Sequence, residues 1–286
     1  MTDVTIFEVG PRDGLQNEKQ FVPTDIKVDL INRLVDAGIN KIECTSFVSP
    51  KWVPQMADAM DVMSAIDRKD NVTYSALTPN ERGMHAALEA NVSEVAVFAA
   101  ASESFSQKNI NCSIEESLTR FDPVMKLAKE NGLKVRGYVS CVTHCPYEGA
   151  IDPAMVKMVG EKLLEMGCYE LSLGDTIGKA HPQDIQKLIE TVTQTISIGN
   201  LALHLHDTYD RALENMQMGL DLGIRTFDSS VAGLGGCPYA EGASGNVSTE
   251  AAVHLIHENG FSTGVELAAL HEVVEFISLT MNSLSD

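Results

Sequence analysis

Short runs of apolar and β-branched residues recur along the chain, and each predicts a strand buried in a sheet. The runs cover residues 4–9, 41–47, 72–77, 94–100, 134–140, 169–174, 201–206 and 226–231. Between them lie segments with the apolar periodicity of amphipathic helices. In segment 24–37 one such stripe is formed by Ile26, Leu30, Ile31, Leu34 and Val35. Apolar strands that alternate with amphipathic helices predict a parallel sheet covered by helices.

Residues suited to helix ends occur within this repeat. Asp152 suits the N-cap of a helix over 152–166, and Pro153 suits its first helical position. Glycines also precede several strands by a few residues, at Gly38, Gly132, Gly167 and Gly223. A glycine there can end a helix in a left-handed conformation and turn the chain into the next strand. We therefore count eight strand–helix units.

Eight such units in 286 residues favour a closed (β/α)₈ barrel over an open doubly wound sheet. No glycine-rich dinucleotide fingerprint follows the first strand, which also counts against the open sheet. We expect an α/β fold with a single TIM-barrel domain over 1–286 and extra helices at its C-terminal end. Residues 233–247 are rich in glycine and small residues, and we expect a mobile active-site loop there.

Composition limits the partners and the location. The formal net charge is -19, so we expect no binding to nucleic acid or to anionic membranes. No apolar run approaches the ~18 residues of a membrane span, and neither end resembles a targeting signal. These features predict a cytoplasmic protein. The six cysteines of so long a chain do not form a disulfide framework, and most lie in apolar segments.

Polar residues gather where the predicted strands end, which is where barrel enzymes build their active sites. The seventh strand carries His204 and His206, which point the same way because strand side chains alternate with period two. Two inward histidines would be costly to bury without partners, and a shared divalent cation is the simplest partner. Two hydrogen-bonded core histidines are the alternative.

Further ligands come from other strand ends. Asp13 follows the first strand, which neighbours the eighth in a closed barrel, and Asn246 is an oxygen donor from the late loop. Imidazoles with oxygen ligands and no thiolate suit Mg²⁺ or Mn²⁺ and fit structural zinc poorly. A ferrous site of two histidines and one carboxylate stays open on this ligand set.

Other candidates have weaker signals. Cys237 lies between glycine and proline in the 233–247 loop, where a thiol near Arg12 and a cation could transfer protons or could be incidental. Lys108 is one of the few cations on the face where a phosphorylated carrier would dock. Cys141 and Cys145 are weak evidence for a second metal site.

Several motifs together resemble the hydroxymethylglutaryl-CoA lyase family of metal-dependent TIM-barrel lyases and synthases. They are GPRDGLQNE, TSFVSPKWVPQM, NINCSIEES, RGYVSC, LSLGDTIG, HLHDTY and VAGLGGCPYAEGASGN, in order from about residue 4 to about 250. The resemblance implies cleavage of 3-hydroxy-3-methylglutaryl-CoA to acetyl-CoA and acetoacetate, with no organic cofactor beyond the CoA substrate. It also suggests a homodimer.

The resemblance also implies residue roles. Asp13, His204, His206 and Asn246 would hold the cation, and Arg12 and Cys237 would be catalytic. Glu43, Asp175 and Glu250 would support the site, the first two as catalytic candidates. The candidates for substrate binding are Arg12, Lys108, Asn109 and Thr176. Asp210 departs from the family, which more often has glycine after HDTY, and we expect it to modulate activity.

Other functions remain open from the sequence. A lyase for a longer branched 3-hydroxyacyl-CoA or a Claisen-type synthase would use similar residues. A ferrous oxygenase would depend on dioxygen. A structural metal-binding barrel would need neither Arg12 nor Cys237.

Overall fold

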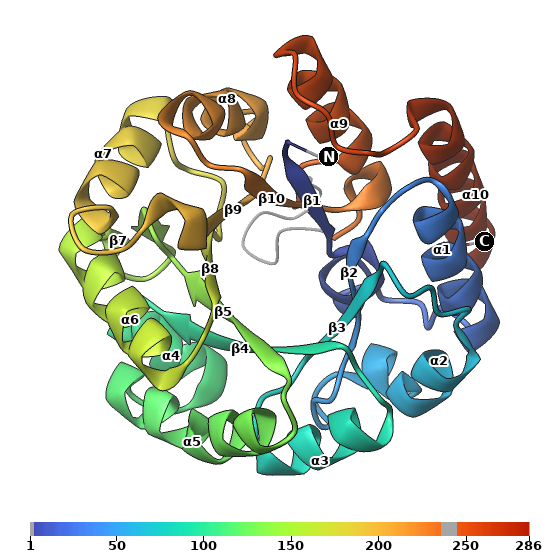
Figure 1. Ribbon diagram of the computed structural model, residues 1–286, viewed down its shortest axis with the longest axis horizontal. Coiled ribbons are helices and arrows are strands. Elements are labelled where there is room, and N and C mark those ends of the chain that lie inside the picture. Colours follow the sequence, from blue (N-terminus) through green and yellow to red (C-terminus); the bar gives the residue numbers. More distant parts are fainter. Residues whose placement is uncertain (1–2, 236–244, 286) are drawn as a thin grey trace.

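Eight parallel strands form a closed barrel in the computed structural model, which describes residues 3–235 and 245–285 (Figure 1). The order around the barrel is β1-β10-β9-β8-β5-β4-β3-β2. The strands are β1 (Thr5–Glu8), β2 (Lys41–Ser46), β3 (Thr73–Leu77), β4 (Glu94–Ala100), β5 (Lys134–Ser140), β8 (Glu170–Asp175), β9 (Leu201–Leu205) and β10 (Thr226–Ser229). The predicted (β/α)₈ barrel is confirmed, and each predicted run overlaps one barrel strand.

The helices surround the barrel, as expected for buried parallel strands (Figure 1). They are α1 (Thr24–Asp36), α2 (Ala59–Ala65), α3 (Glu81–Glu89), α4 (Glu103–Ile110), α5 (Ile114–Glu130), α6 (Pro153–Met166), α7 (Pro182–Val192), α8 (Ala212–Leu222), α9 (Thr249–Glu258) and α10 (Leu267–Ser285). Helix α10 is the extra C-terminal helix; it lies beside α1, where the Arg33 guanidinium is 4.4 Å from the centre of the Phe276 ring. A short hairpin, β6 (His144–Cys145) with β7 (Gly149–Ala150), follows β5. Among the described residues, no helix is both long enough and apolar enough to cross a bilayer.

The predicted helix signals are confirmed. The Asp152 side chain accepts a hydrogen bond from the Ala154 amide at the start of α6. Gly167 ends the same helix with φ +116°, and Gly38, Gly132 and Gly223 also have positive φ. These glycines adopt the left-handed conformation that side chains with a Cβ disfavour.

The alternation along β9 sets up the site. A Cβ placed on Gly219 of α8 would lie 2.5 Å from the Leu203 Cδ1 atom, so Leu203 faces the helices. His204, the next residue, therefore faces the barrel interior. Closure of the barrel brings β1 against β10, so residues from both ends of the sequence meet at the same mouth. Whether 233–247 is mobile stays a prediction, since residues 236–244 lie outside the described part of the chain.

Candidate active site

A cavity of about 1130 Å³ opens at the carboxyl ends of the barrel strands. It is lined by apolar and aromatic side chains and by a polar group at its base. The sequence-predicted residues that line it are Arg12, Asp13, Lys108, Asn109, Thr176, His204, His206 and Asn246. The barrel therefore brings together most of the candidates predicted from the sequence.

A single π-helical turn, η1 (Gly10–Gly14), follows β1 and presents Arg12 and Asp13 to this cavity. Its closing bond runs from the Gly14 amide to the Val9 carbonyl at 3.1 Å. A Cβ on Gly14 would lie 2.7 Å from the Ser230 Oγ atom and 2.8 Å from the Leu234 Cβ atom. Glycine therefore lets the turn pack closely against the segment after β10. π-Turns of this kind are frequent at functional sites.

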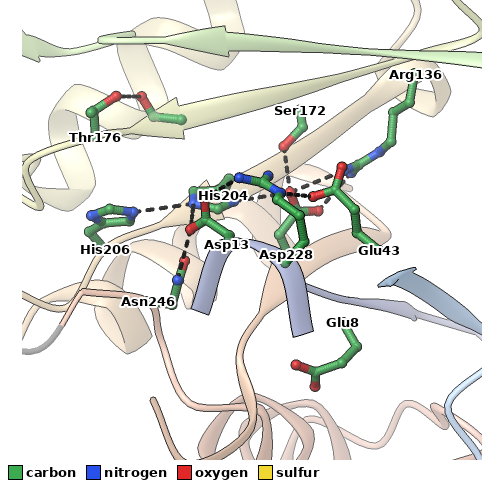
Figure 2. A network of polar contacts seen from close by, with 12 residues as sticks. Glu8, Asp13, Glu43, Arg136, Ser172, Thr176, His204, His206, Asp228 and Asn246 are labelled. Carbon is green, nitrogen blue, oxygen red and sulfur yellow. Dashed lines mark hydrogen bonds and ion pairs between the residues drawn. The ribbon is translucent and has the colours of Figure 1, made fainter. Parts of the chain in front are cut away.

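The two histidines face each other at the base of the cavity (Figure 2). Their Nε2 atoms are 3.2 Å apart, and the Asp13 Oδ2 atom is 3.9 Å from the Nε2 atom of His204. One possible ligand atom from each of Asp13, His204 and His206 lies within 4.8 Å of the others. Two imidazole nitrogens and a carboxylate oxygen this close together fit one divalent cation.

Asn246 is placed at this cluster by backbone pairing. The Val247 amide donates to the Leu205 carbonyl at 3.0 Å, and residues 206 and 246 form an antiparallel bridge. The Asn246 Nδ2 group donates to the Asp13 Oδ2 atom at 2.9 Å. The side chain predicted as a further ligand thus lies directly beside Asp13.

Electrostatics favour an ionised Asp13 and a neutral His206. Burial would raise the pKa of Asp13, but Arg12 and the two imidazoles outweigh it and hold that pKa well below its usual range. Burial, together with the neighbouring His204, lowers the pKa of His206 to about 4. A neutral imidazole and a carboxylate are the forms that bind a metal.

Arg12 is held between two carboxylates. Its Nε group donates to the Glu43 Oε2 atom, and its Nη1 group donates to the Asp13 Oδ1 atom at 2.5 Å. Its guanidinium carbon is 5.6 Å from the centre of the Tyr138 ring. Its remaining nitrogen, Nη2, has no hydrogen-bond partner among the described residues, and Arg12 lines the cavity. The contact with Glu43 therefore fixes the orientation of the Arg12 guanidinium.

A buried ion-pair network behind His204 was missed by the sequence reasoning. The Asp228 carboxylate from β10 lies 3.1 Å from the His204 Nδ1 atom and accepts two hydrogen bonds from Arg136 of β5 (Figure 2). The Arg136 Nε group donates to Glu170 at 2.8 Å. The available signal was a charged residue, Arg136 or Asp228, inside an apolar run that predicts a buried strand.

Two strand-end acids point away from this network. The Asp175 carboxylate accepts hydrogen bonds from the Thr143 hydroxyl at 2.8 Å and from the Ala180 amide at 2.9 Å. Asp175 is outside the cavity lining, and its contacts fix the turn after β8, whereas Thr176 lines the cavity. Glu8 also lies apart from the network and accepts from the Val231 amide and the Thr249 hydroxyl (Figure 2).

Residues 3–277 match the sequence model of the HMGL-like family. The chain belongs to the HMGL-like family. The resemblance inferred from the motifs is confirmed by this match.

Relatives of this HMGL-like chain are similar over almost its whole length. The mitochondrial hydroxymethylglutaryl-CoA lyase of Bos taurus is 55% identical, and the alignment covers 98% of this chain and 86% of the relative. The cytoplasmic 3-hydroxy-3-methylglutaryl-CoA lyase of Homo sapiens is 53% identical, with 99% of this chain and 76% of the relative covered.

Solved structures agree. The hydroxymethylglutaryl-CoA lyase of Pseudomonas aeruginosa is 52% identical with a TM-score of 0.96, covering 98% of this chain and 93% of that one. An HMG-CoA lyase from Acinetobacter baumannii, solved with coenzyme A and 3-methylmalate, is 36% identical with a TM-score of 0.92. That alignment covers 98% of this chain and 91% of the other.

Three further predictions for this HMGL-like chain concern Cys237, Glu250 and Asp175. Cys237, predicted as the catalytic thiol, lies outside the described residues. Glu250, predicted to support the site, accepts a hydrogen bond from the Ala232 amide at 3.1 Å. A catalytic role for Asp175 stays a prediction, because its carboxylate is occupied by Thr143 and Ala180.

Proposed function

We propose that this chain cleaves (S)-3-hydroxy-3-methylglutaryl-CoA to acetyl-CoA and acetoacetate in a reaction that depends on a divalent cation. The observation that carries the proposal is the convergence of Asp13, His204 and His206 with Arg12 in one cavity. A structural metal site would not need a guanidinium beside it. The names of the relatives support the same reaction class.

Asp13, His204, His206 and Asn246 would hold the cation, and Mg²⁺ or Mn²⁺ suits their nitrogen and oxygen atoms. For Asn246 to contribute its oxygen, its amide would have to turn, because its nitrogen is the group 2.9 Å from Asp13. A cation bound there would polarise the substrate and lower the pKa of its hydroxyl group.

Arg12 would stabilise the negative charge that develops on the enolate. Retro-Claisen cleavage moves a proton from the tertiary hydroxyl, breaks a carbon–carbon bond and leaves an enolate on the acetyl thioester. With Nε and Nη1 held by Glu43 and Asp13, the guanidinium is fixed in place and Nη2 is left to donate to the enolate oxygen. Such a donor acts as an oxyanion hole does. We propose Cys237 as the proton donor to the enolate carbon.

The cavity has room and chemistry for an acyl-CoA. Lys108 and Asn109 of α4 line it and are the proposed contacts for the carrier's phosphates, and Thr176 is proposed to contact the acyl group. We also propose a homodimer in the cytoplasm. The cytoplasmic location is supported by the name of the human relative, although the bovine relative is named mitochondrial.

The direct test is an assay on protein stripped of metal by a chelator. We expect acetoacetate from hydroxymethylglutaryl-CoA only after Mg²⁺ or Mn²⁺ is restored, and we expect Arg12→Gln to lower kcat by ~10²–10³. Arg82→Gln is a control on an exposed side chain. Unchanged turnover in Arg12→Gln would remove Arg12 from the mechanism. Cleavage of only a longer branched acyl-CoA, or only condensation, would replace this substrate assignment.

A further inference from the structure

We propose that Asp228, anchored by Arg136, positions His204 with its proton on Nδ1, so that the Nε2 atom of His204 faces the site of a divalent cation. The inference rests on the metal site of the proposed function. It concerns Asp228 and Arg136, to which the sequence reasoning gave no role. Asp228 touches neither the cavity nor the proposed ligand Asp13, so it is a positioning residue.

The contacts of Asp228 define the direction of the His204 ring. Asp228 and His204 are paired in register across β10 and β9. The Asp228 Oδ2 atom lies 3.1 Å from the His204 Nδ1 atom and accepts a hydrogen bond from the Ser172 hydroxyl at 2.7 Å. An ionised carboxylate only accepts hydrogen bonds, so the proton between these two atoms belongs to His204 Nδ1. The Nε2 atom of His204 then faces the cavity.

Arg136 keeps that carboxylate ionised and immobile. Its Nη1 and Nη2 groups donate to the two oxygens of Asp228 at 3.1 and 2.7 Å. Both side chains are fully buried, and a paired fork of this kind has a fixed geometry. Burial would raise the pKa of Asp228, but Arg136 and His204 hold that pKa well below its usual range.

His206 has no equivalent partner. Its Nδ1 atom is buried and has no hydrogen-bond partner among residues 3–235 and 245–285. Its Nε2 atom lies 3.2 Å from the Nε2 atom of His204. The His206 ring therefore lacks the anchor that Asp228 gives to His204, and the two histidines are not equivalent.

The first test is metal affinity in matched variants. Asp228→Asn can donate from its amide to His204 Nδ1 and so favours the tautomer with the proton on Nε2, the wrong one for binding. We expect Asp228→Asn to weaken Mn²⁺ binding by about 10–100-fold, the range for such supporting residues. Glu170→Gln is the matched control, because Glu170 also pairs with buried Arg136 but does not contact His204 in the structure. We expect its Mn²⁺ affinity, measured by titration calorimetry, to stay within about threefold of the wild-type value.

Thermal unfolding of both variants separates positioning from stability. Comparable losses of stability with unequal losses of Mn²⁺ affinity support the proposal. Equal losses of affinity in both variants, or wild-type affinity in Asp228→Asn, would overturn it.

The second test needs no substitution and stands even if Asp228→Asn does not fold. Two-dimensional NMR of ¹⁵N-labelled imidazoles reports which nitrogen is protonated, at a pH where both rings are neutral. We expect His204 to be protonated on Nδ1 both in the metal-free wild type and after Mg²⁺ is added. His204 protonated on Nε2 would contradict the proposal. Both readouts are independent of turnover, so a protein with this tautomer pattern that fails to cleave hydroxymethylglutaryl-CoA would refute the proposed function alone.

Discussion

Adjacent opposite charges set the geometry of the barrel mouth. Arg12 and Asp13 are neighbours in sequence and bond to each other, and each also bonds to a residue from a distant strand or loop. Breaking one of these pairs leaves its partner buried without compensation, which costs more than the pair itself contributes. For variants of Arg12 or Asp13, metal affinity and turnover must therefore be measured separately.

Asp210 shows backbone strain close to the site. Its φ is +55°, in the left-handed region that glycine tolerates best, and its charge raises the pKa of Asp207, which burial already raises. We predict that Asp210→Gly raises the free energy of unfolding by ~1 kcal/mol, measured by urea denaturation. Asp210→Ala removes the same charge but keeps a Cβ at this φ, so it should not share the gain. Equal stability of the two variants would show that strain at residue 210 is unimportant.

At the residue scale, sequence predicted side chains best where strand alternation decides their direction. His204 and His206 could be placed inside the barrel by period two. Asp175 shares its phase with Leu171 and Leu173 rather than with Ser172, and this phase was the overlooked sign that it faces away from the cavity. Asp228 was missed because nothing local shows that its partners will be Arg136 and His204, which come from other strands.

At the element scale, helix ends were predictable because glycine and N-cap preferences act locally. The π-turn Gly10–Gly14 was not, because a single such turn has no repeating pattern. The bridge between residues 206 and 246 was also not predictable. It depends on how the segment after β10 returns to β9, which closure of the barrel decides.

Two glycines at helix ends distinguish the cost of backbone strain from the cost of a steric clash with a neighbouring segment. Gly132 has φ +68°, and a Cβ there would have no heavy atom within 4 Å, whereas a Cβ on Gly38 would lie 2.3 Å from the Gly264 carbonyl oxygen. We predict that Gly132→Ala costs ~1 kcal/mol through strain alone and that Gly38→Ala costs a further ~1–3 kcal/mol. Urea denaturation measures both. If Gly38→Ala is no worse than Gly132→Ala, the packing of α1 against the segment before α10 is looser than described.

At the scale of the whole molecule, barrel closure joins residues that are distant in sequence. Glu8 at the end of β1 bonds to Val231 and to Thr249 at the start of α9. The fold class was predictable because eight similar units repeat. The meeting of β1 with β10 followed from closure, but the contacts of Glu8 depended on the turn after β10.

Barrel closure buries Glu8, and the effect of this burial on the free energy of unfolding depends on pH. Burial raises the pKa of Glu8 from 4.5 to about 7. Between these values the native state keeps a proton that the unfolded chain has lost, so this group's contribution to stability falls as pH rises. We predict that Glu8→Gln removes this decline, so the variant gains stability relative to wild type from about pH 4.5 to about pH 7. Glu89→Gln, on an exposed side chain, should leave the wild-type pH profile unchanged. Parallel profiles of Tm against pH for Glu8→Gln and wild type would contradict the assignment.

The most direct measurement titrates Mn²⁺ into metal-free protein and follows bound metal and acetoacetate release in the same samples. We predict that both rise together and saturate at about one Mn²⁺ per chain, since Asp13, His204 and His206 form one cluster. His204→Ala should lose both signals. Full acetoacetate release before Mn²⁺ binds, or unchanged release in His204→Ala, would contradict a metal-dependent active site at this cluster.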